Sequence, residues 1–300
     1  LYYLHGIELG EIGYLLLALT VVTIIIQPLV RSLNSWIGSK LMFLVGLFCL
    51  SVFIPFLSPY SQDIYGSVHF EIAGQPHSFF HWFCSDRAGR DMFTITIRAA
   101  FYSLKIAFGV VFFSVLVGVP IGMFSGVSNK RTDEVIMRIT DGFLAFPPMI
   151  LPLAITAILG PSLNNVIIGI SISWFPWYVR IARSQSLVIS SLDYVSISKS
   201  MGASKYHIIK THILPNSLTP IFTQASIDAG YAILTAAGLS FIGLGAQHPE
   251  VEWGLLVTQS RAQFLNHWWV VFFPGIFMCL TVVCLNVIGD EFCNNETVEK

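Results

Sequence analysis

The chain alternates between long apolar runs and short polar connections. A helix needs about 17–25 apolar residues to cross a bilayer, and each run is long enough to do so. The runs cover residues 12–30, 41–57, 100–124, 135–159, 164–182, 217–245 and 269–289. This pattern predicts an all-α, polytopic membrane protein with six to seven transmembrane helices.

The first run has two interpretations. A secretory signal peptide would carry a basic region before its apolar stretch and a small-residue cleavage site after it. Neither is found around residues 12–30. We therefore interpret this run as an extra membrane helix, so that residues 1–57 form N-terminal membrane helices.

Residues 58–92, called the polar loop here, form the longest polar connection. His69, His77 and His81 could capture a metal, but only if residues 77–81 are helical, so an ordinary loop is favoured. At its end, Ser85 or Asp86 has the side chain expected to cap the helix that follows.

Two of the apolar runs contain an acidic residue. Asp141 lies in run 135–159, which also carries Pro147, Pro148 and Pro152, so that helix should be distorted. Asp228 is the sole charge in run 217–245. An unpaired charge inside a span costs about 2.5–3.5 kcal/mol, so Asp228 should face other helices or water, or bond to a neighbouring Ser or Gln.

Residues 193–216, called the basic segment here, are polar and carry Lys199, Lys205 and Lys210 between two apolar runs. Gly202 divides the segment, because glycine ends a helix at low cost in the left-handed conformation. Pro215 fits a break before the next run. An apolar triplet at helical spacing lies on each side of Gly202: Tyr194, Ile197 and Met201, then Tyr206, Ile209 and Ile213. The pattern predicts two short amphipathic helices joined at a bend.

Composition and charge agree with a membrane protein of defined orientation. The chain is 54% hydrophobic and 11% charged, with a mean hydropathy of +0.71, whereas soluble domains carry roughly 25% charged residues. If the runs alternate, most Lys and Arg residues fall on one side, which is then cytoplasmic. That side holds Arg31, Lys40, Lys130, Arg131, Arg138, Arg180, Arg183, Lys199, Lys205 and Lys210, against Arg87, Arg90 and Arg261 on the other. The basic segment is thus expected inside and the polar loop outside.

The basic segment resembles the cytoplasmic coupling loop of ABC-importer permease subunits, in the branch that moves peptides and nickel. Gly202 and Leu214-Pro215 have the family spacing, and MGAS and HILPN are typical of the peptide branch. The family's Glu-Ala-Ala triplet is replaced by Ser196, Ile197 and Ser198. The stretch CSDRAGRDMF matches the family's external helix-start motif through Asp86, Gly89, Arg90 and Asp91, and LSFIGLG with Trp253-Gly254 also resembles this branch.

The resemblance implies the type I ABC importer transmembrane fold, with a permease domain over 93–290, a coupling loop within 183–216 and a cytoplasmic tail over 291–300. It assigns ATPase coupling to the basic segment and places the helix around Asp141 beside the translocation path. Expected coupling residues are Tyr194, Ile197, Met201, Gly202, Ala203, Tyr206, Ile209, Leu214 and Pro215, and expected path residues are Asp141, Phe146, Pro147 and Asp228.

The chain shows no Walker A, GxSxG or HExxH pattern, so we expect no enzyme activity, cofactor or metal site. The resemblance then implies two ABC ATPase subunits, a second homologous permease subunit and an extracytoplasmic substrate-binding protein. It places the chain in a bacterial inner membrane, within the lipid bilayer and with no nucleic-acid partner. Peptides are the expected cargo and nickel the alternative.

Two other classes of protein remain open at this stage. A secondary transporter driven by an ion gradient would use intramembrane acids, for which Asp141 and Asp228 are candidates, but no internal repeat is visible. A membrane-embedded enzyme would need clustered His, Asp or Glu residues at one depth, which the sequence does not indicate.

Overall fold

A computed structural model describes residues 35–74 and 81–298 of the chain. Within these ranges the chain forms helices and turns and no strand, so the predicted all-α class is confirmed. The described chain divides into two compact units, and three helices contribute to both. The predicted run at 12–30 lies outside the described residues.

The first unit joins the N-terminal part of the chain to its C-terminal helices. It includes α3 as far as Ile106, α9 from Ala236 and α11 as far as Ile288. Its elements are α2 (Ser35–Leu57), η1 (Ser61–Tyr65), η2 (Phe70–Ile72), α3 (Met92–Gly126), α10 (Trp253–Ser260), η4 (Arg261–Gln263) and α11 (Trp269–Val298). In this unit α10 is fixed to α3 by Trp253, whose indole N–H donates to the Thr96 carbonyl at 2.9 Å.

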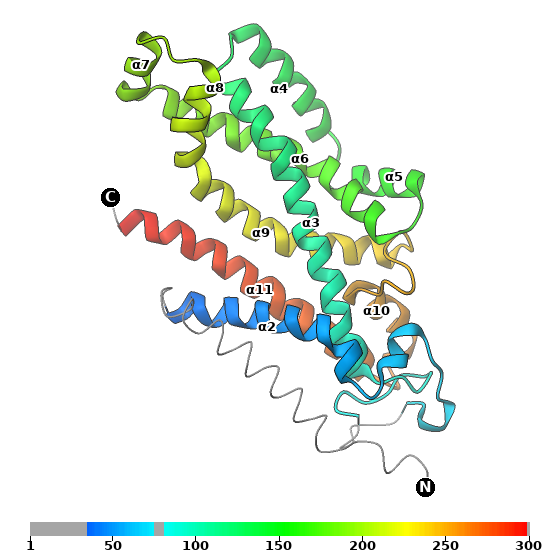
Figure 1. Ribbon diagram of the computed structural model, residues 1–300. Helices are drawn as coiled ribbons and strands as arrows, with labels where there is room; N and C mark the ends of the chain where they lie inside the picture. The colour runs from blue at the N-terminus through cyan, green and yellow to red at the C-terminus, as the bar shows by residue number, and fades with distance from the viewer. Residues whose placement is uncertain (1–34, 75–80, 299–300) are drawn as a thin grey trace. The chain divides into compact units, whose positions relative to one another are not determined.

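The second unit contains the rest of α3, the chain as far as Thr235 and the end of α11 from Gly289. Its further elements are α4 (Lys130–Leu144), α5 (Ile150–Leu159), α6 (Leu163–Ser190), α7 (Asp193–Ser200), α8 (Lys205–Ile208), η3 (Ile209–Ile213), a π-helical turn, and α9 (Leu214–Phe241). Figure 1 shows α7 and α8 together at one end of this unit. A buried core joins them to α3, α6 and α9, through Val119, Met123, Tyr178, Ala182, Ile189, Val195, Ile208, Ile213 and Ile221.

Close packing of α3 on α6 depends on glycines spaced one helical turn apart. Gly118 faces Phe175 and Tyr178, and Gly122 faces the carbonyl of Val179. A side chain at Gly122 would collide with that backbone, so only glycine permits this approach between the two helices.

Six segments of the described chain can account for the predicted spans. Three satisfy both length and composition: Lys40–Leu57, Met92–Gly126 and Trp269–Asp290. At 28 residues each, α6 and α9 exceed the length needed but are more polar. The sixth is divided: the predicted run at 135–159 is shared between the charged helix α4 and the short apolar helix α5, with the non-helical residues 145–149 between them.

Two predicted boundaries differ from the structure. The helix of the run predicted to begin at residue 135 already begins at Lys130, because the Asn129 side chain caps α4 by accepting from the Thr132 amide at 2.9 Å. The last helix continues through the expected tail boundary at 290 to Val298. Residues 291–298 contain no Gly or Pro to end it.

Candidate functional site

The basic segment folds as two short helices separated by a bend. Gly202 has φ of +89°, and its amide donates to the Lys199 carbonyl at 3.0 Å, so it ends α7 as predicted. Ser204 caps α8 by accepting from the His207 amide at 3.2 Å. The predicted bend at Gly202 and the short helix before it are therefore confirmed, whereas the second predicted helix is not a separate short element, because α8 continues through η3 into α9.

The break predicted at Pro215 is wrong. The chain runs from α8 through η3 into α9 without interruption, and Pro215 lies in the first turn of α9. Proline lacks an amide hydrogen and its ring obstructs the usual bond to residue i−4. The wider π turn at Ile209–Ile213 lies directly before it and accommodates this loss without a break.

The two predicted apolar triplets differ in how exposed their side chains are. Tyr194, Ile197 and Met201 are all exposed, and Tyr206 is also exposed beyond the bend. Ile213 is instead fully buried in the core of the second unit, and Ile209 and Ala203 pack against that core. Tyr194, Ile197, Met201 and Tyr206 are called the exposed apolar face below.

His212 joins the two halves of the bent segment. Its Nε2 lies 3.4 Å from the Ser198 hydroxyl, and its ring contacts the Tyr194 ring edge-on at 5.5 Å between centroids. Beneath the face, Val195 and Ile208 are buried. The sequence pattern did not identify His212, because its partners lie across the bend rather than one helical turn away.

The predicted distortion around Pro147 is a complete break between α4 and α5. Residues 145–149 are not helical, and Phe146 and Pro147 are exposed. One turn before the break, Asp141 Oδ1 accepts a hydrogen bond of 2.6 Å from Arg180 Nη2 of α6. The structure thus brings three predicted path residues, Asp141, Phe146 and Pro147, to one exposed region and adds Arg180, which the sequence interpretation had missed.

Asp228 lies elsewhere in the second unit. Its Oδ1 accepts a hydrogen bond of 2.8 Å from Gln224 one turn earlier on α9. Among the described residues no contact joins Asp228 to Asp141 or Arg180. The expected hydrogen bond to a neighbouring Gln is the arrangement found.

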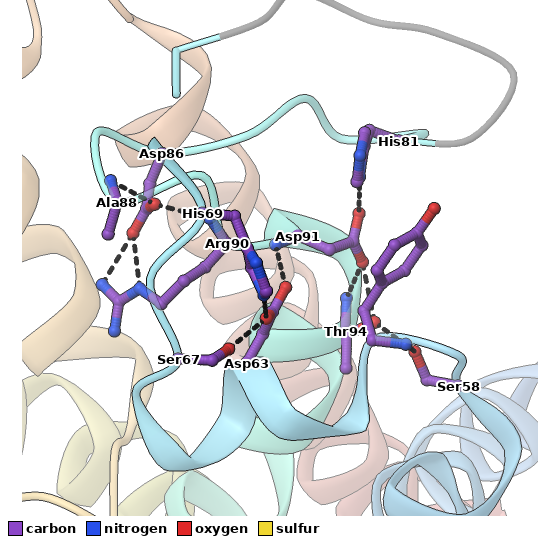
Figure 2. Close-up of polar contacts among 11 residues, drawn as sticks. Ser58, Asp63, Ser67, His69, His81, Asp86, Ala88, Arg90, Asp91 and Thr94 are labelled. Atoms are coloured by element: carbon purple, nitrogen blue, oxygen red, sulfur yellow. Dashed lines mark hydrogen bonds and ion pairs between the residues drawn. The ribbon is translucent and has the colours of Figure 1, made fainter. Parts of the chain in front are cut away.

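The helix-start motif builds a tight turn in the first unit (Figure 2). The Asp86 carboxylate accepts from the amides of Ala88 and Arg90, at 2.8 and 2.9 Å, and from the Arg90 side chain at 2.8 Å. Gly89 has φ of +75°, and a side chain there would collide with the backbone carbonyl of His69. Asp86, Gly89 and Arg90 therefore each have a structural reason for their identity.

The cap of α3 is Asp91, and the expectation of Ser85 or Asp86 was wrong. Asp91 Oδ2 accepts from the Thr94 amide at 2.8 Å and from its hydroxyl at 2.7 Å, as Figure 2 shows. The helix begins at Met92, so Asp86 is too far away to cap it and its carboxylate closes the preceding turn instead.

The histidines of the polar loop contact separate carboxylates. His69 Nε2 lies 3.2 Å from Asp63, and His81 Nδ1 lies 3.1 Å from Asp91. Asp63 also accepts the Asp91 amide at 2.7 Å, which links the two pairs. His77 lies outside the described residues, and within them no three metal-binding side chains come together.

Glu252 is a buried carboxylate that the sequence interpretation had missed. It caps α10 by accepting from the amides of Gly254 and Leu255, at 2.5 and 2.6 Å, and it accepts from the Ser240 hydroxyl at 2.6 Å. Burial raises the pKa of Glu252, and these three donors oppose the rise. Its neighbour Trp253 donates its amide to Ser103 of α3 at 3.1 Å. Glu252 therefore sets the position of α10.

Comparison with known proteins identifies relatives over most of the chain. Residues 118–292 match the family model described as binding-protein-dependent transport system inner membrane component. The probable D,D-dipeptide transport system permease protein DdpC of Escherichia coli (strain K12) is 41% identical, over 82% of each chain. The dipeptide transport system permease protein DppC of Alkalihalophilus pseudofirmus is 39% identical, over 83% of this chain and 81% of the relative.

A likeness to a solved structure covers the fold alone. A chain of the MetNI methionine ABC transporter, in an inward facing conformation, superposes with a TM-score of 0.57 at 20% identity. The match covers 66% of this chain and 94% of the other. The expected type I importer fold is thereby confirmed.

Proposed function

Because the chain belongs to the family of binding-protein-dependent transport system inner membrane components, we propose that it is the permease subunit of an ATP-driven peptide importer. Relatives named for dipeptide and D,D-dipeptide transport, which match four-fifths of the chain, support peptides as the cargo. The partners are two ABC ATPase subunits, a second homologous permease subunit and an extracytoplasmic binding protein.

The exposed apolar face is the observation that carries the coupling role. Tyr194, Ile197, Met201 and Tyr206 are large, apolar and exposed, on a segment whose other side is anchored in a buried core. A helical segment that presents apolar side chains typically binds in a groove of a partner. The basic segment would dock in an ATPase subunit in this way, on the cytoplasmic side that the Lys and Arg distribution indicates.

The break between α4 and α5 supports a place beside the translocation path. Irregular backbone at membrane depth is tolerated only where protein covers it or where it lines a water-filled cavity. Residues 145–149 are irregular, and Phe146 and Pro147 are exposed on the chain. ATP-driven closure of the ATPase subunits would move these spans between inward-open and outward-open states.

Reconstituted transport tests this function. The chain, purified with its ATPase and second permease subunits in proteoliposomes, should accumulate a radiolabelled dipeptide when ATP and the binding protein are supplied. Uptake of Ni²⁺ in place of the dipeptide would overturn the peptide assignment. Uptake driven by an ion gradient without ATP would overturn the importer class.

A matched pair of tyrosines tests the docking role. Tyr206 and Tyr65 are 72% and 73% exposed, on the basic segment and the polar loop respectively. Tyr206→Ser should weaken retention of the ATPase subunits during purification, whereas Tyr65→Ser should not. Equal retention in both variants would contradict docking at the exposed apolar face.

A further inference from the structure

Two ion pairs join α4 to α6. In the first, between Asp133 and Arg183, both carboxylate oxygens are already hydrogen-bonded. Asp133 accepts from Arg183 through both oxygens, Oδ1 to Nε at 2.6 Å and Oδ2 to Nη2 at 2.7 Å. The Ser125 hydroxyl adds a third hydrogen bond at 2.6 Å. The side chains of Arg183 and Asp133 are 30% and 18% exposed. This bidentate pair has the geometry of a brace between the helices.

The second ion pair, between Arg180 and Asp141, is called the open pair here because both of its side chains are exposed. Arg180 Nη2 and Asp141 Oδ1 make a single contact at 2.6 Å, and their side chains are 44% and 55% exposed. No further hydrogen bond to either group is found in the described part of the chain. One carboxylate oxygen and most of the guanidinium donors are thus available to another molecule.

The open pair lies beside the helix break. The Asp141 carbonyl accepts the Ala145 amide at 2.9 Å, and α4 ends at Leu144. Charged side chains and irregular backbone are both unfavourable against lipid tails. Broken helices of transporters commonly mark the place where substrate binds. The surface that holds Asp141 and Arg180 therefore faces water or protein.

A free peptide carries charges that complement this pair. Its α-carboxylate matches the planar fork of a guanidinium, which binds carboxylates through two parallel hydrogen bonds. Its α-ammonium matches a carboxylate. An exposed ion pair with a single contact contributes little to stability, so substrate can replace that contact readily.

We propose that Asp141 and Arg180 form a binding point for the charged ends of a peptide, with Arg180 on the α-carboxylate and Asp141 on the α-ammonium. The inference rests on the proposed function as a peptide permease. It gives Arg180 and Asp141 a binding role toward the two charged ends of that substrate.

Binding measured without the binding protein tests the site, because the binding protein has its own selectivity. The assembled transporter in lipid nanodiscs would be titrated with L-alanyl-L-alanine, its N-acetyl derivative and its C-terminal amide. In Arg180→Gln the charge-assisted contact with the α-carboxylate is lost, so the unmodified and N-acetyl peptides should bind about tenfold more weakly. The affinity for the C-terminal amide, which has no α-carboxylate, should not change. In Asp141→Asn the unmodified and amide peptides should weaken about tenfold and the N-acetyl peptide should not.

The brace provides the matched controls. Asp133→Asn and Arg183→Gln remove an ion pair between the same helices, and they should change thermal stability and affect all three peptides alike. If Asp141→Asn and Arg180→Gln behaved like these controls, the open pair would be only a second brace. If Arg180→Gln instead released the second permease subunit, the surface would be a subunit interface. Either result would overturn the proposal.

These measurements also distinguish a failure of the proposed binding site from a failure of the proposed function. A wild-type transporter that accumulates dipeptide with ATP and binding protein, but binds none of the three peptides alone, would overturn the site and leave the function standing. A wild-type transporter that accumulates no dipeptide would overturn both.

Discussion

Substitution of Gly202 tests the bend of the basic segment. Gly202 has φ of +89°, and a Cβ added there would meet no atom within 4 Å. The cost of a side chain is therefore confined to the backbone. For an L-residue in the left-handed region this cost is about 1–2 kcal/mol, larger for a β-branched residue and smaller for Asn. Each 1.4 kcal/mol is a tenfold change in a conformational equilibrium.

The bend has other support, which limits the effect. A straight helix through Gly202 would break the contacts of His212 with Ser198 and Tyr194. It would also withdraw Val195 from the core. We therefore expect the docking-competent population to fall by up to about tenfold in Gly202→Val, less in Gly202→Ala and least in Gly202→Asn.

The assay compares ATPase retention and stimulation of ATP hydrolysis by loaded binding protein. ATPase retention and stimulation should both be reduced least in Gly202→Asn, more in Gly202→Ala and most in Gly202→Val. Membrane insertion should be unchanged in all three. Gly66→Val is the matched control, because Gly66 has φ of +92° and equally open surroundings but lies in the polar loop. Equal effects of Gly202→Val and Gly66→Val, or no effect of either, would refute the reasoning.

Four further predictions concern the orientation of the chain, the partly buried Asp228 and the buried Glu252. In a chain freed of its own cysteines, an impermeant thiol reagent on intact cells should label Gln62→Cys and not Lys205→Cys; the reverse labelling would invert the topology. Asp228→Asn should retain more uptake than Asp228→Leu, because Asn can still bond to Gln224, and equal uptake would exclude a polar role. Glu252→Ala should cost about 2–4 kcal/mol and Glu252→Gln less, measured by thermal unfolding, because Ala leaves three buried donors unsatisfied. The stability that the raised pKa of Glu252 confers should fall as the pH rises through that pKa, and this dependence should be absent in Glu252→Gln.

The features that the sequence predicted correctly depend on local backbone chemistry. The left-handed end of α7 at Gly202 follows from the absence of a Cβ, and the break near Pro147 follows from the proline ring. Pro215 shows the limit of this reasoning. Whether this proline breaks the helix depends on the preceding turn. The π turn η3 accommodates the missing hydrogen bond, and residue type alone does not predict such a turn.

The features that were missed depend on partners far apart in the chain. Asp141 and Arg180 are 39 positions apart, and nothing in the spacing of either residue indicates the other. In the sequence, Glu252 resembles any acidic residue of a loop. Only the structure shows that it caps α10 and accepts from the Ser240 hydroxyl. Ser85 and Asp86 were the predicted caps of α3, and the sequence did not indicate that the Asp86 carboxylate closes the preceding turn while Asp91 caps the helix.

One helix connects the exposed apolar face to the open ion pair. The buried core beneath the face includes Ala182 and Ile189 of α6, packed with Val195 of α7 and Ile208 of α8. Arg180 lies on the same helix, two residues before Ala182. Close-packed interiors transmit displacement because they contain little space to absorb it. A movement of α7 would reach α6 through these packing contacts, and α6 also carries the Arg180 partner of Asp141, so we expect the exposed apolar face and the open ion pair to respond together.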